Sequence, residues 1–147
     1  DRLVLICPPG HHLAGRDRVT LPTLKEENFV AFAPDLPTRR EIDRRLRHAG
    51  VKVNRIREFE NIETLKRAVE AENAVSIVPE TSVRHEVESG TLVAISFTES
   101  DMFRILGALV RRSARISPAL RELLLLLENA GRIGAISIAE RGLRTSD

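Results

Sequence analysis

Residues 59–79 constrain the fold of this chain more than any other stretch, because they join a helical pattern directly to a strand pattern. Apolar residues recur at helical spacing over positions 62–69 and form one stripe along a helix. Asn61 stands where an N-cap belongs, with a side chain that can accept from a first-turn N–H group. Positions 75–78 form a short apolar run, rich in β-branched residues, that closes at Pro79 and predicts a buried strand. A helix followed at once by a core strand is the repeating unit of an α/β sheet, so we expect an α/β fold.

A second helix is predicted to begin at Thr38. Thr38 and Glu41 have the spacing of a capping box, in which the hydroxyl and the carboxylate each satisfy a free backbone donor. Pro37 and Ile42 stand where a hydrophobic staple would pack. Gly50 is the expected stop at the carboxyl end. Thr38 is therefore predicted to be the N-cap of this helix.

Other patterns predict short strands and helices along the whole chain. Strands are expected at residues 3–7, 29–33, 51–59, 92–97 and 103–110, and short helical segments at residues 21–24 and 83–89. A last helix is expected from Pro118, with Ser117 as its cap. Residues 123–127 of that helix are five consecutive leucines, so it must be covered on more than one side. We expect a second copy of the chain, or further residues of the same protein, to cover it.

Composition excludes several classes of function. The 147 residues carry a formal net charge of only +2, with five Phe and no Trp or Tyr, which argues against a nucleic-acid surface or a base-stacking platform. Cys7 is the only cysteine, so no internal disulfide can form and a cytoplasmic location is expected. No apolar run is long enough to span a bilayer, so no membrane partner is expected.

Catalytic, metal and cofactor sites are also not expected. His11, His12, His48 and His85 lack ligand spacing with cysteine or carboxylates, and adjacent histidines usually diverge, so we expect no metal ion. Cys7 lies in an apolar strand, where a thiol is inert. No nucleophile elbow and no phosphate loop is present, so we expect neither an enzyme nor a cofactor.

The order of the patterns resembles the effector-binding domain of the LysR-type transcriptional regulators, over roughly residues 1–128. The residues that carry the resemblance are His11 with Leu13-Ala14, the segment 24–32, Thr38-Arg39 with Ile42-Asp43, Glu63-Thr64 with Val69 and residues 75–79, Gly90-Thr91-Leu92-Val93, and Ser117-Pro118. His12 stands where the family usually has proline. Glu72 and Ala74 replace two glycines, although Asn73 between them can adopt a left-handed backbone.

The resemblance implies a periplasmic-binding-protein-like (type II) effector domain. Residues 1–9 would be a strand crossing from the first lobe, residues 10–101 the second lobe, residues 102–130 a returning strand and first-lobe helix, and residues 131–147 a tail. The strands at residues 3–7 and 103–110 leave and re-enter one lobe, so they should run antiparallel. The implied protein is a homo-oligomer that contacts DNA only through an N-terminal domain outside this chain.

The resemblance also implies a site for a small effector at two helix starts, with Thr38, Arg39, Asn61, Ile62 and Thr64 as its residues. Helix N-termini offer free N–H donors and partial positive charge, which favours an anion. Glu41 and Glu63 are expected in the same first turns, where their negative charges would repel an anionic ligand. A neutral or zwitterionic ligand is therefore the alternative. On the residues alone, Thr38 is better explained as a cap. For Thr64, a role in the helix and a role in ligand binding are equally supported, because Asn61 already caps its helix.

Two functions remain open at this stage. One is the sensing domain of a regulator, which binds a small molecule without chemistry. The other is a solute-binding or enzymatic domain of the same two-lobe architecture, since a fold does not fix a function. The residues encoded upstream of Asp1 would separate them, because a helix-turn-helix supports the first and a signal peptide the second.

Overall fold

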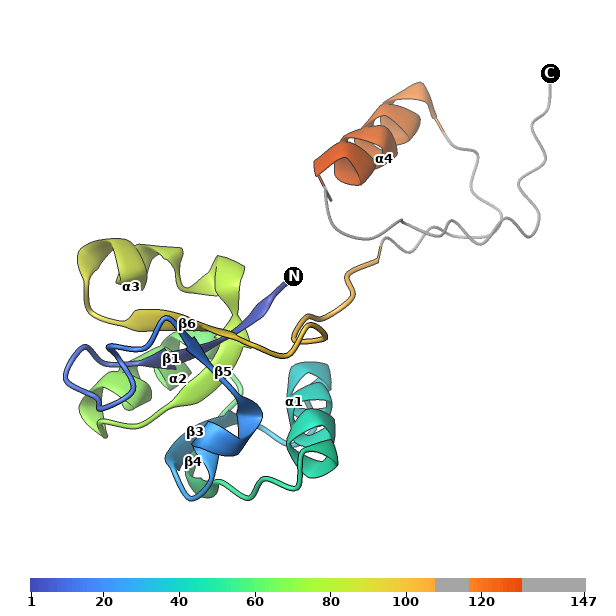
Figure 1. Cartoon of the computed structure of the whole chain (residues 1–147). Helices are drawn as coiled ribbons and strands as arrows, with labels where there is room; N and C mark the ends of the chain where they lie inside the picture. Colours follow the sequence, from blue (N-terminus) through green and yellow to red (C-terminus); the bar gives the residue numbers. More distant parts are fainter. Residues whose placement is uncertain (108–116, 131–147) are drawn as a thin grey trace. The chain divides into compact units, whose positions relative to one another are not determined.

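The structure, a computed structural model, describes residues 1–107 and 117–130 (Figure 1). These residues belong to two compact units, which we call unit 1 (Asp1–Ile105) and unit 2 (Leu106–Asp147) and describe separately. The expected tail at residues 131–147 and the positions 108–110 of the last expected strand lie outside the described residues.

Unit 1 alternates strands and helices, as an α/β fold requires. Its strands are β1 (Leu3–Cys7), β2 (Arg18–Val19), β3 (Asn28–Phe32), β4 (Asn54–Phe59), β5 (Ser76–Pro79) and β6 (Val93–Phe97). Its helices are η1 (Leu21–Leu24), α1 (Pro37–His48), α2 (Ile62–Ala71), η2 (Glu80–Ser82) and α3 (Arg84–Ser89). Unit 2 contributes α4 (Pro118–Ala130). The α/β prediction is confirmed.

All strands of unit 1 run in one direction except β1. The order β2-β6-β1-β5 forms one sheet, in which β1 is antiparallel to both of its neighbours, and β3 pairs in parallel with β4 in a second sheet. A parallel bridge between Phe29 and Val75 joins the two sheets. The ends of β3, β4 and β5 therefore lie at one edge, which we call the carboxyl edge. The start of β1 lies there too, because Leu3 is opposite Pro79.

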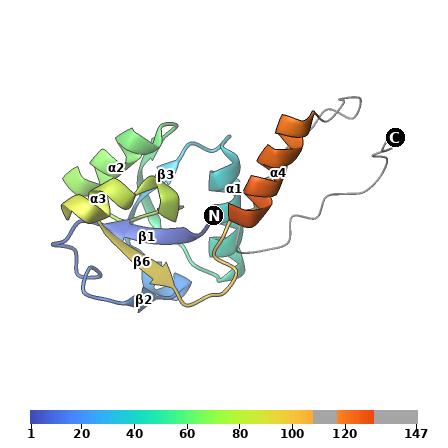
Figure 2. The same ribbon diagram turned by 90° about the horizontal axis from the view of Figure 1, so that it is seen from above.

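The core forms around β1, whose five residues are all buried. Helix α2 contacts β1 and β3, and α3 contacts β6 (Figure 2). The stripe expected on α2 is real, since Leu65 and Val69 are fully buried. Each such side chain stabilises the fold by about 1.5–3 kcal/mol relative to an exposed one. The stripe therefore fixes the face that α2 turns toward the sheet.

Helix α1 begins two residues earlier than a cap at Thr38 predicts, and the expected capping box at Thr38 is wrong. The N-cap is Leu36, which has extended backbone and no side-chain capping bond. Pro37 takes the first helical position, where its fixed φ suits a helix, and it keeps the residue before it extended. Glu41 pairs with Arg44 and Arg45 instead of reaching back to the helix start. The Thr38 hydroxyl is therefore not a cap.

The other predicted helix ends are confirmed. The Asn61 side chain accepts from the N–H groups of Glu63 at 2.7 Å and Thr64 at 3.3 Å, so Asn61 caps α2. Gly50, the expected stop of α1, takes a left-handed φ of 66°, and Gly90 likewise follows α3 with a left-handed φ of 73°. Asn73 takes φ 46°, the left-handed conformation expected of it between Glu72 and Ala74.

The segment that follows β6 is antiparallel to the start of the chain, as predicted, but it forms a single isolated bridge and no regular strand. Arg2 and Phe103 form an isolated antiparallel bridge. The N–H of Leu3 donates to the carbonyl of Met102 at 3.0 Å, and the N–H of Arg104 donates to that of Asp1 at 2.8 Å. Residues 104–107 have no strand structure, so a strand over residues 103–107 is a wrong prediction.

Helix α4 begins as predicted, because the Ser117 hydroxyl accepts from the N–H of Leu120 at 3.2 Å. Leu123, Leu125, Leu126 and Leu127 are exposed. Among the described residues, no helix is both long and apolar enough to cross a membrane.

Candidate functional site

The starts of α1 and α2 both follow strands that end at the carboxyl edge. Strands β3 and β4 are parallel neighbours whose last residues, Phe32 and Phe59, are paired. The pairing continues past the strands, since the N–H of Ala33 donates to the carbonyl of Phe59 at 2.9 Å. Each strand then leads into a helix, α1 at Pro37 and α2 at Ile62. Ligands of open α/β sheets bind in crevices at such strand ends, so this edge is the candidate site.

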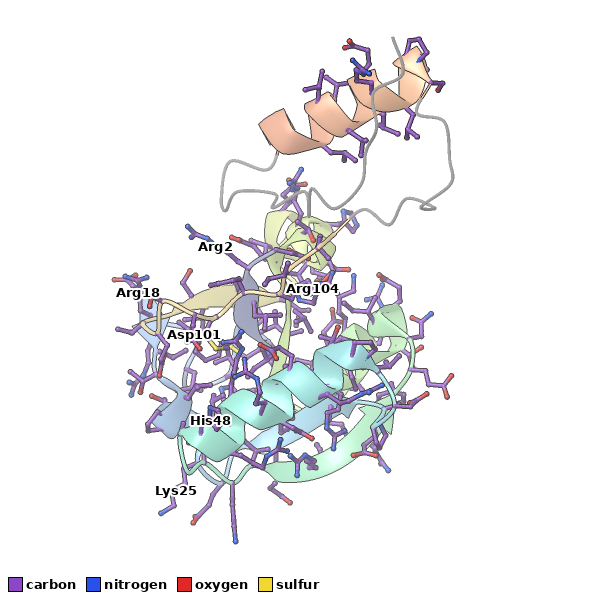
Figure 3. The ribbon with its side chains drawn as sticks, turned by 90° about the vertical axis from the view of Figure 1, so that its right-hand side faces the viewer. Arg2, Arg18, Lys25, His48, Asp101 and Arg104 are labelled. Carbon is purple, nitrogen blue, oxygen red and sulfur yellow. The ribbon has the colours of Figure 1, made fainter. Side chains whose placement is uncertain are left out.

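At the start of α1, the Thr38 hydroxyl meets an arginine from the far end of unit 1. Arg104 Nη1 donates to Thr38 Oγ1 at 3.3 Å, and the Arg104 guanidinium also pairs with Asp1 at 2.8 Å (Figure 3). Arg104 is one-third exposed, so one side of its guanidinium faces solvent. Helix geometry leaves the first-turn N–H groups of α1 without intrahelical acceptors. Hydroxyl, N–H and guanidinium donors therefore meet at this helix start.

Arg39, also predicted for the site, has a structural role in unit 1. Its guanidinium is buried and donates to Asp43 at 2.8 Å, to Glu58 at 2.9 Å and to the carbonyl of Phe32. Burial alone would lower the pKa of Arg39, but the hydrogen bonds to Asp43 and Glu58 raise it, so the side chain stays charged. These contacts fix α1 against the ends of β3 and β4. Arg39 thus orients the helix start.

At the start of α2, fewer donors are free than the sequence suggests. Asn61 is exposed and occupies the N–H groups of Glu63 and Thr64. Ile62 is half-buried and packs against the core. Thr64 is exposed, and its hydroxyl makes no hydrogen bond within residues 1–107 and 117–130. The side chain of Thr64, more than the helix end itself, is the donor that α2 offers.

Both glutamates that were expected to oppose an anion are paired with cations, and Glu41 lies beyond the first turn of α1, which holds no acidic residue. Glu63 Oε1 lies 2.8 Å from Lys66 Nζ. The pKa of Glu41 is lowered, first by its hydrogen bond with Arg44 and then, against the opposing effect of burial, by the charge of Arg45. Arg45 in turn donates to Asp101 at 2.6 Å. The negative charges of Glu41 and Glu63 are therefore balanced.

Sequence reasoning missed Arg104, which the structure brings to Thr38. The two residues are 66 positions apart, so no local pattern links them. The available signal was a single charge inside the apolar run 103–110. In a regular buried strand, the charge of Arg104 would have been buried. In the structure only Phe103 forms a bridge, and the Arg104 side chain lies beside α1.

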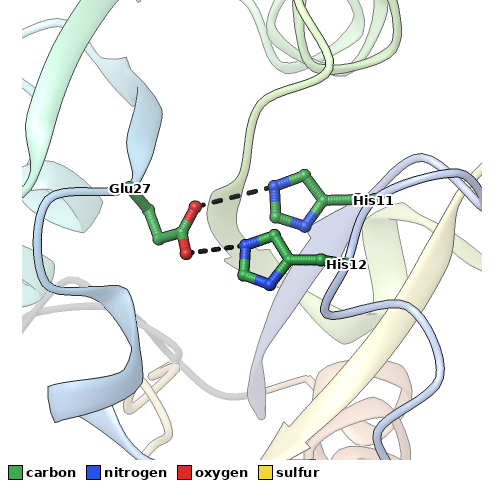
Figure 4. Close-up of side chains that lie close together, drawn as sticks. All are labelled: His11, His12 and Glu27. Atoms are coloured by element: carbon green, nitrogen blue, oxygen red, sulfur yellow. Dashed lines mark hydrogen bonds and ion pairs between the residues drawn. The ribbon is translucent and has the colours of Figure 1, made fainter.

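A second cluster of polar side chains lies away from the carboxyl edge, in the turn after β1. The rings of His11 and His12 lie 4.5 Å apart, and both face Glu27 (Figure 4). The expectation that adjacent histidines diverge is therefore wrong here. Side chains alternate in a strand, but these two residues lie in a turn, where that alternation does not apply.

The chain belongs to the family of LysR substrate binding domains, whose family model matches residues 1–132. Among curated proteins, a RuBisCO operon transcriptional regulator of Allochromatium vinosum is 31% identical over 117 residues. That match covers 80% of this chain and 39% of the relative, so the chain spans well under half of the relative's length.

Solved structures show the same fold. The regulatory domain of CcmR from Synechocystis PCC6803, in complex with 2-PG, has a TM-score of 0.67 at 19% identity, over 90% of this chain and 64% of that one. The effector binding domain of QuiR, in complex with shikimate, has a TM-score of 0.67 at 18% identity, over 88% of this chain and 61% of that one. The chain is thus a portion of a periplasmic-binding-protein-like regulatory domain.

Proposed function

We propose that this chain is the ligand-sensing part of a LysR-type transcriptional regulator, and that it binds a small anionic effector at the carboxyl edge. The observation that carries the proposal is the pairing of β3 with β4, because these neighbouring strands end at the same edge and lead into α1 and α2. The site would comprise Thr38 and Thr64 as hydroxyl donors, with Arg104 as the cation. Asn61, Ile62 and Arg39 would hold the two helix starts in place.

The charges of unit 1 favour an anion over the neutral ligand that the sequence left open. Glu41 and Glu63 are paired with cations, so the partial positive charge of the two helix starts is not cancelled. Arg104 adds a full charge that is one-third exposed. The relatives point the same way, since QuiR binds shikimate, a small carboxylate.

The proposed mechanism is binding without chemistry. Residues 10–101 would form one lobe, and residues 1–9 and 102–130 would connect it to the other lobe of the effector domain. The Asp1–Arg104 pair lies where the two connections meet, so an effector that engages Arg104 changes the contacts of both. Such differential contacts are what a ligand needs to shift a two-state equilibrium. DNA contact belongs to an N-terminal domain outside this chain.

The test is calorimetry of the full-length protein against a panel of small carboxylates, with single substitutions at the proposed site. Thr64→Val removes a donor but no volume, so it should weaken binding about tenfold, as the loss of roughly 1.4 kcal/mol of hydrogen bonding predicts. Arg104→Gln should weaken binding at least as much. Thr38→Ser keeps the hydroxyl and should have little effect.

Thr91→Val is the matched control, because Thr91 is exposed and precedes β6, at the edge opposite to the carboxyl edge. Thr38→Ser, Thr64→Val and Thr91→Val should keep the melting temperature nearly unchanged, since none of these side chains is buried. Arg104→Gln should lower it, because the buried carboxylate of Asp1 loses its partner. If Thr64→Val binds the best carboxylate as tightly as the unmodified protein and Thr91→Val, the site assignment is wrong.

A further proposal concerns the exposed leucines of α4. Leaving these side chains in water forfeits about 1.5–3 kcal/mol each, and an exposed apolar patch marks an interface. We propose that a second copy of the protein, or residues of its first lobe, covers them. Sedimentation at micromolar concentration tests this, and a monomer with an ordered, solvent-exposed leucine face would contradict it.

A further inference from the structure

We propose that His11, His12 and Glu27 form a binding site for a divalent transition-metal ion such as Zn²⁺, which would tie the turn after β1 to the start of β3. The three residues offer two imidazole nitrogens and a carboxylate oxygen, all within 4.8 Å of one another. The inference is independent of the effector proposal, because β1 ends and β3 begins at the edge opposite to the carboxyl edge.

The backbone on both sides of this cluster is fixed by hydrogen bonds. In the histidine turn, the N–H of His11 donates to the carbonyl of Pro8 at 3.0 Å, and that of Ala14 donates to His11 at 2.9 Å. The carbonyl of Glu27 accepts from the N–H of Asn54 at 2.9 Å, which holds it beside β4. The three side chains are thus presented by two anchored segments, so little conformational freedom would be lost on binding.

The spacing of the donor atoms suits a tetrahedral ion. The Nε2 atom of His12 lies 2.8 Å from Glu27 Oε1, and that of His11 lies 3.7 Å from Glu27 Oε2 (Figure 4). Ligands at about 2.0–2.1 Å from a tetrahedral zinc ion are about 3.3 Å from one another. These two distances end on different oxygens of Glu27, and with one donor atom from each residue the three atoms lie within 4.8 Å of one another, so side-chain rotations would have to bring them closer around the ion.

The ligand set and its exposure point to one class of ion. Two histidines and one carboxylate leave a fourth position open, as in the zinc sites of many enzymes, and imidazole favours zinc, copper and nickel over magnesium and calcium. His12 is 64% exposed whereas His11 is 5% exposed, which gives the ion an entry path and one rigid ligand. With water in the fourth position, the ion would hold the turn after β1 and the start of β3 together, and no catalytic role is proposed.

Binding would rearrange one proton at His11. The N–H of Leu13 donates to His11 Nδ1 at 3.3 Å, which places the proton of a neutral ring on Nε2, facing Glu27. A metal ion at Nε2 needs the other tautomer, so this long hydrogen bond must open. The pKa of His11 is lowered, first by burial and then by His12, against the opposing charge of Glu27. Metal binding needs the neutral form of this ring.

The experiment is a titration of the full-length, chelator-treated protein with zinc chloride at pH 7, by calorimetry and by amide NMR. We expect one zinc ion at this cluster and a shift of the Leu13 amide signal, because its hydrogen bond opens. His12→Gln and Glu27→Gln should each weaken this binding by about tenfold or more, which is the scale of losing even an indirect metal contact. His85→Gln, at an exposed histidine of α3, should bind as the unmodified protein does.

A melting curve with and without zinc gives a second measurement. Zinc should raise the melting temperature of the unmodified protein and of His85→Gln but not of Glu27→Gln, since an ion that binds only the native state stabilises it. The proposal is overturned if the protein binds no zinc at this pH. It is equally overturned if zinc shifts amide signals elsewhere but not that of Leu13, or if His12→Gln binds zinc undiminished.

Discussion

Replacing Lys66 with methionine should destabilise unit 1 strongly, because Lys66 neutralises a buried carboxylate. Its ammonium is only 5% exposed and lies 2.8 Å from Glu86, whose side chain is 11% exposed. It also donates to the carbonyl of Ser82 at 3.0 Å and pairs with the exposed Glu63. This cluster connects α2 with η2 and α3, so it fixes the helix that carries Asn61 and Thr64.

The loss in the free energy of unfolding depends on which partner of Lys66 is buried. The pair with Glu63 is exposed on one side and contributes about 0.3–0.5 kcal/mol. Removing Lys66 leaves Glu86 as an unpaired buried charge, which typically costs about 3–5 kcal/mol. The second oxygen of Glu86 has no hydrogen-bond partner among the described residues, so nothing replaces Lys66. We expect a loss of about 3–5 kcal/mol at pH 7.

The stabilisation from the Lys66–Glu86 pair should depend on pH. Burial would raise the pKa of Glu86, but the hydrogen bond from Lys66 outweighs it and holds the pKa below its ordinary value of 4.5. Burial would lower the pKa of Lys66, but its bonds to Glu63 and Glu86 raise it above 10.5. The stabilisation is thus present between about pH 4.5 and 10.5 and is lost as either group titrates in the folded state. In Lys66→Met, the deficit should shrink as Glu86 becomes protonated.

Urea denaturation at pH 7 and pH 4 measures the stability that Lys66→Met loses relative to the unmodified protein. Lys25→Met is the matched control, because Lys25 is exposed, and it should lie within about 0.5 kcal/mol of the unmodified protein. Lys66→Met/Glu86→Leu should recover much of the loss, since no charge is left buried. A loss below about 1 kcal/mol for Lys66→Met at pH 7, or an equal loss at both pH values, would refute the reasoning.

Three further outcomes follow from the structure. Asn61→Ala removes the cap of α2 and should cost about 1 kcal/mol in urea denaturation, whereas Asn61→Asp keeps an acceptor and should cost less. Gly90→Ala places a side chain at φ 73° and should cost roughly 1–2 kcal/mol, although no atom crowds the site. Gly10→Ala is the control, because Gly10 has no positive φ, and equal stability of the two variants would contradict the prediction. Burial, and to a smaller extent the charge of Glu27, raises the pKa of the Cys7 thiol to about 11, so native protein should resist alkylation at pH 8 while urea-unfolded protein reacts rapidly.

Local signals predicted α2 well because its cap and its stripe lie within one segment. Asn61, Leu65 and Val69 act through neighbours in sequence, so the pattern and the structure agree. The start of α1 failed because two local signals competed: a capping box at Thr38 and a proline at the first helical position. Pro37 determined the outcome, since it fixes its own φ and restricts Leu36.

The parts that sequence reasoning missed depend on contacts between distant residues. Arg104 reaches Thr38 only because the chain returns to the start of β1, which no local pattern contains. His11 and His12 converge on Glu27 across 15 positions that include β2 and η1. Conversely, Arg39 looked available to a ligand because its partners Asp43 and Glu58 belong to two different elements.

The position of β1 has a consequence for the order in which the protein folds during synthesis. β1 is made before both of its partners, β5 and β6, with Val4 opposite both Val78 and Ser96. While the ribosome makes the intervening residues, the apolar segment Leu3–Cys7 has neither of these partners, and closing so long a loop slows folding. Until β6 emerges, an aggregation-prone strand stays open to other chains, and a chaperone that binds short apolar segments would find its target there.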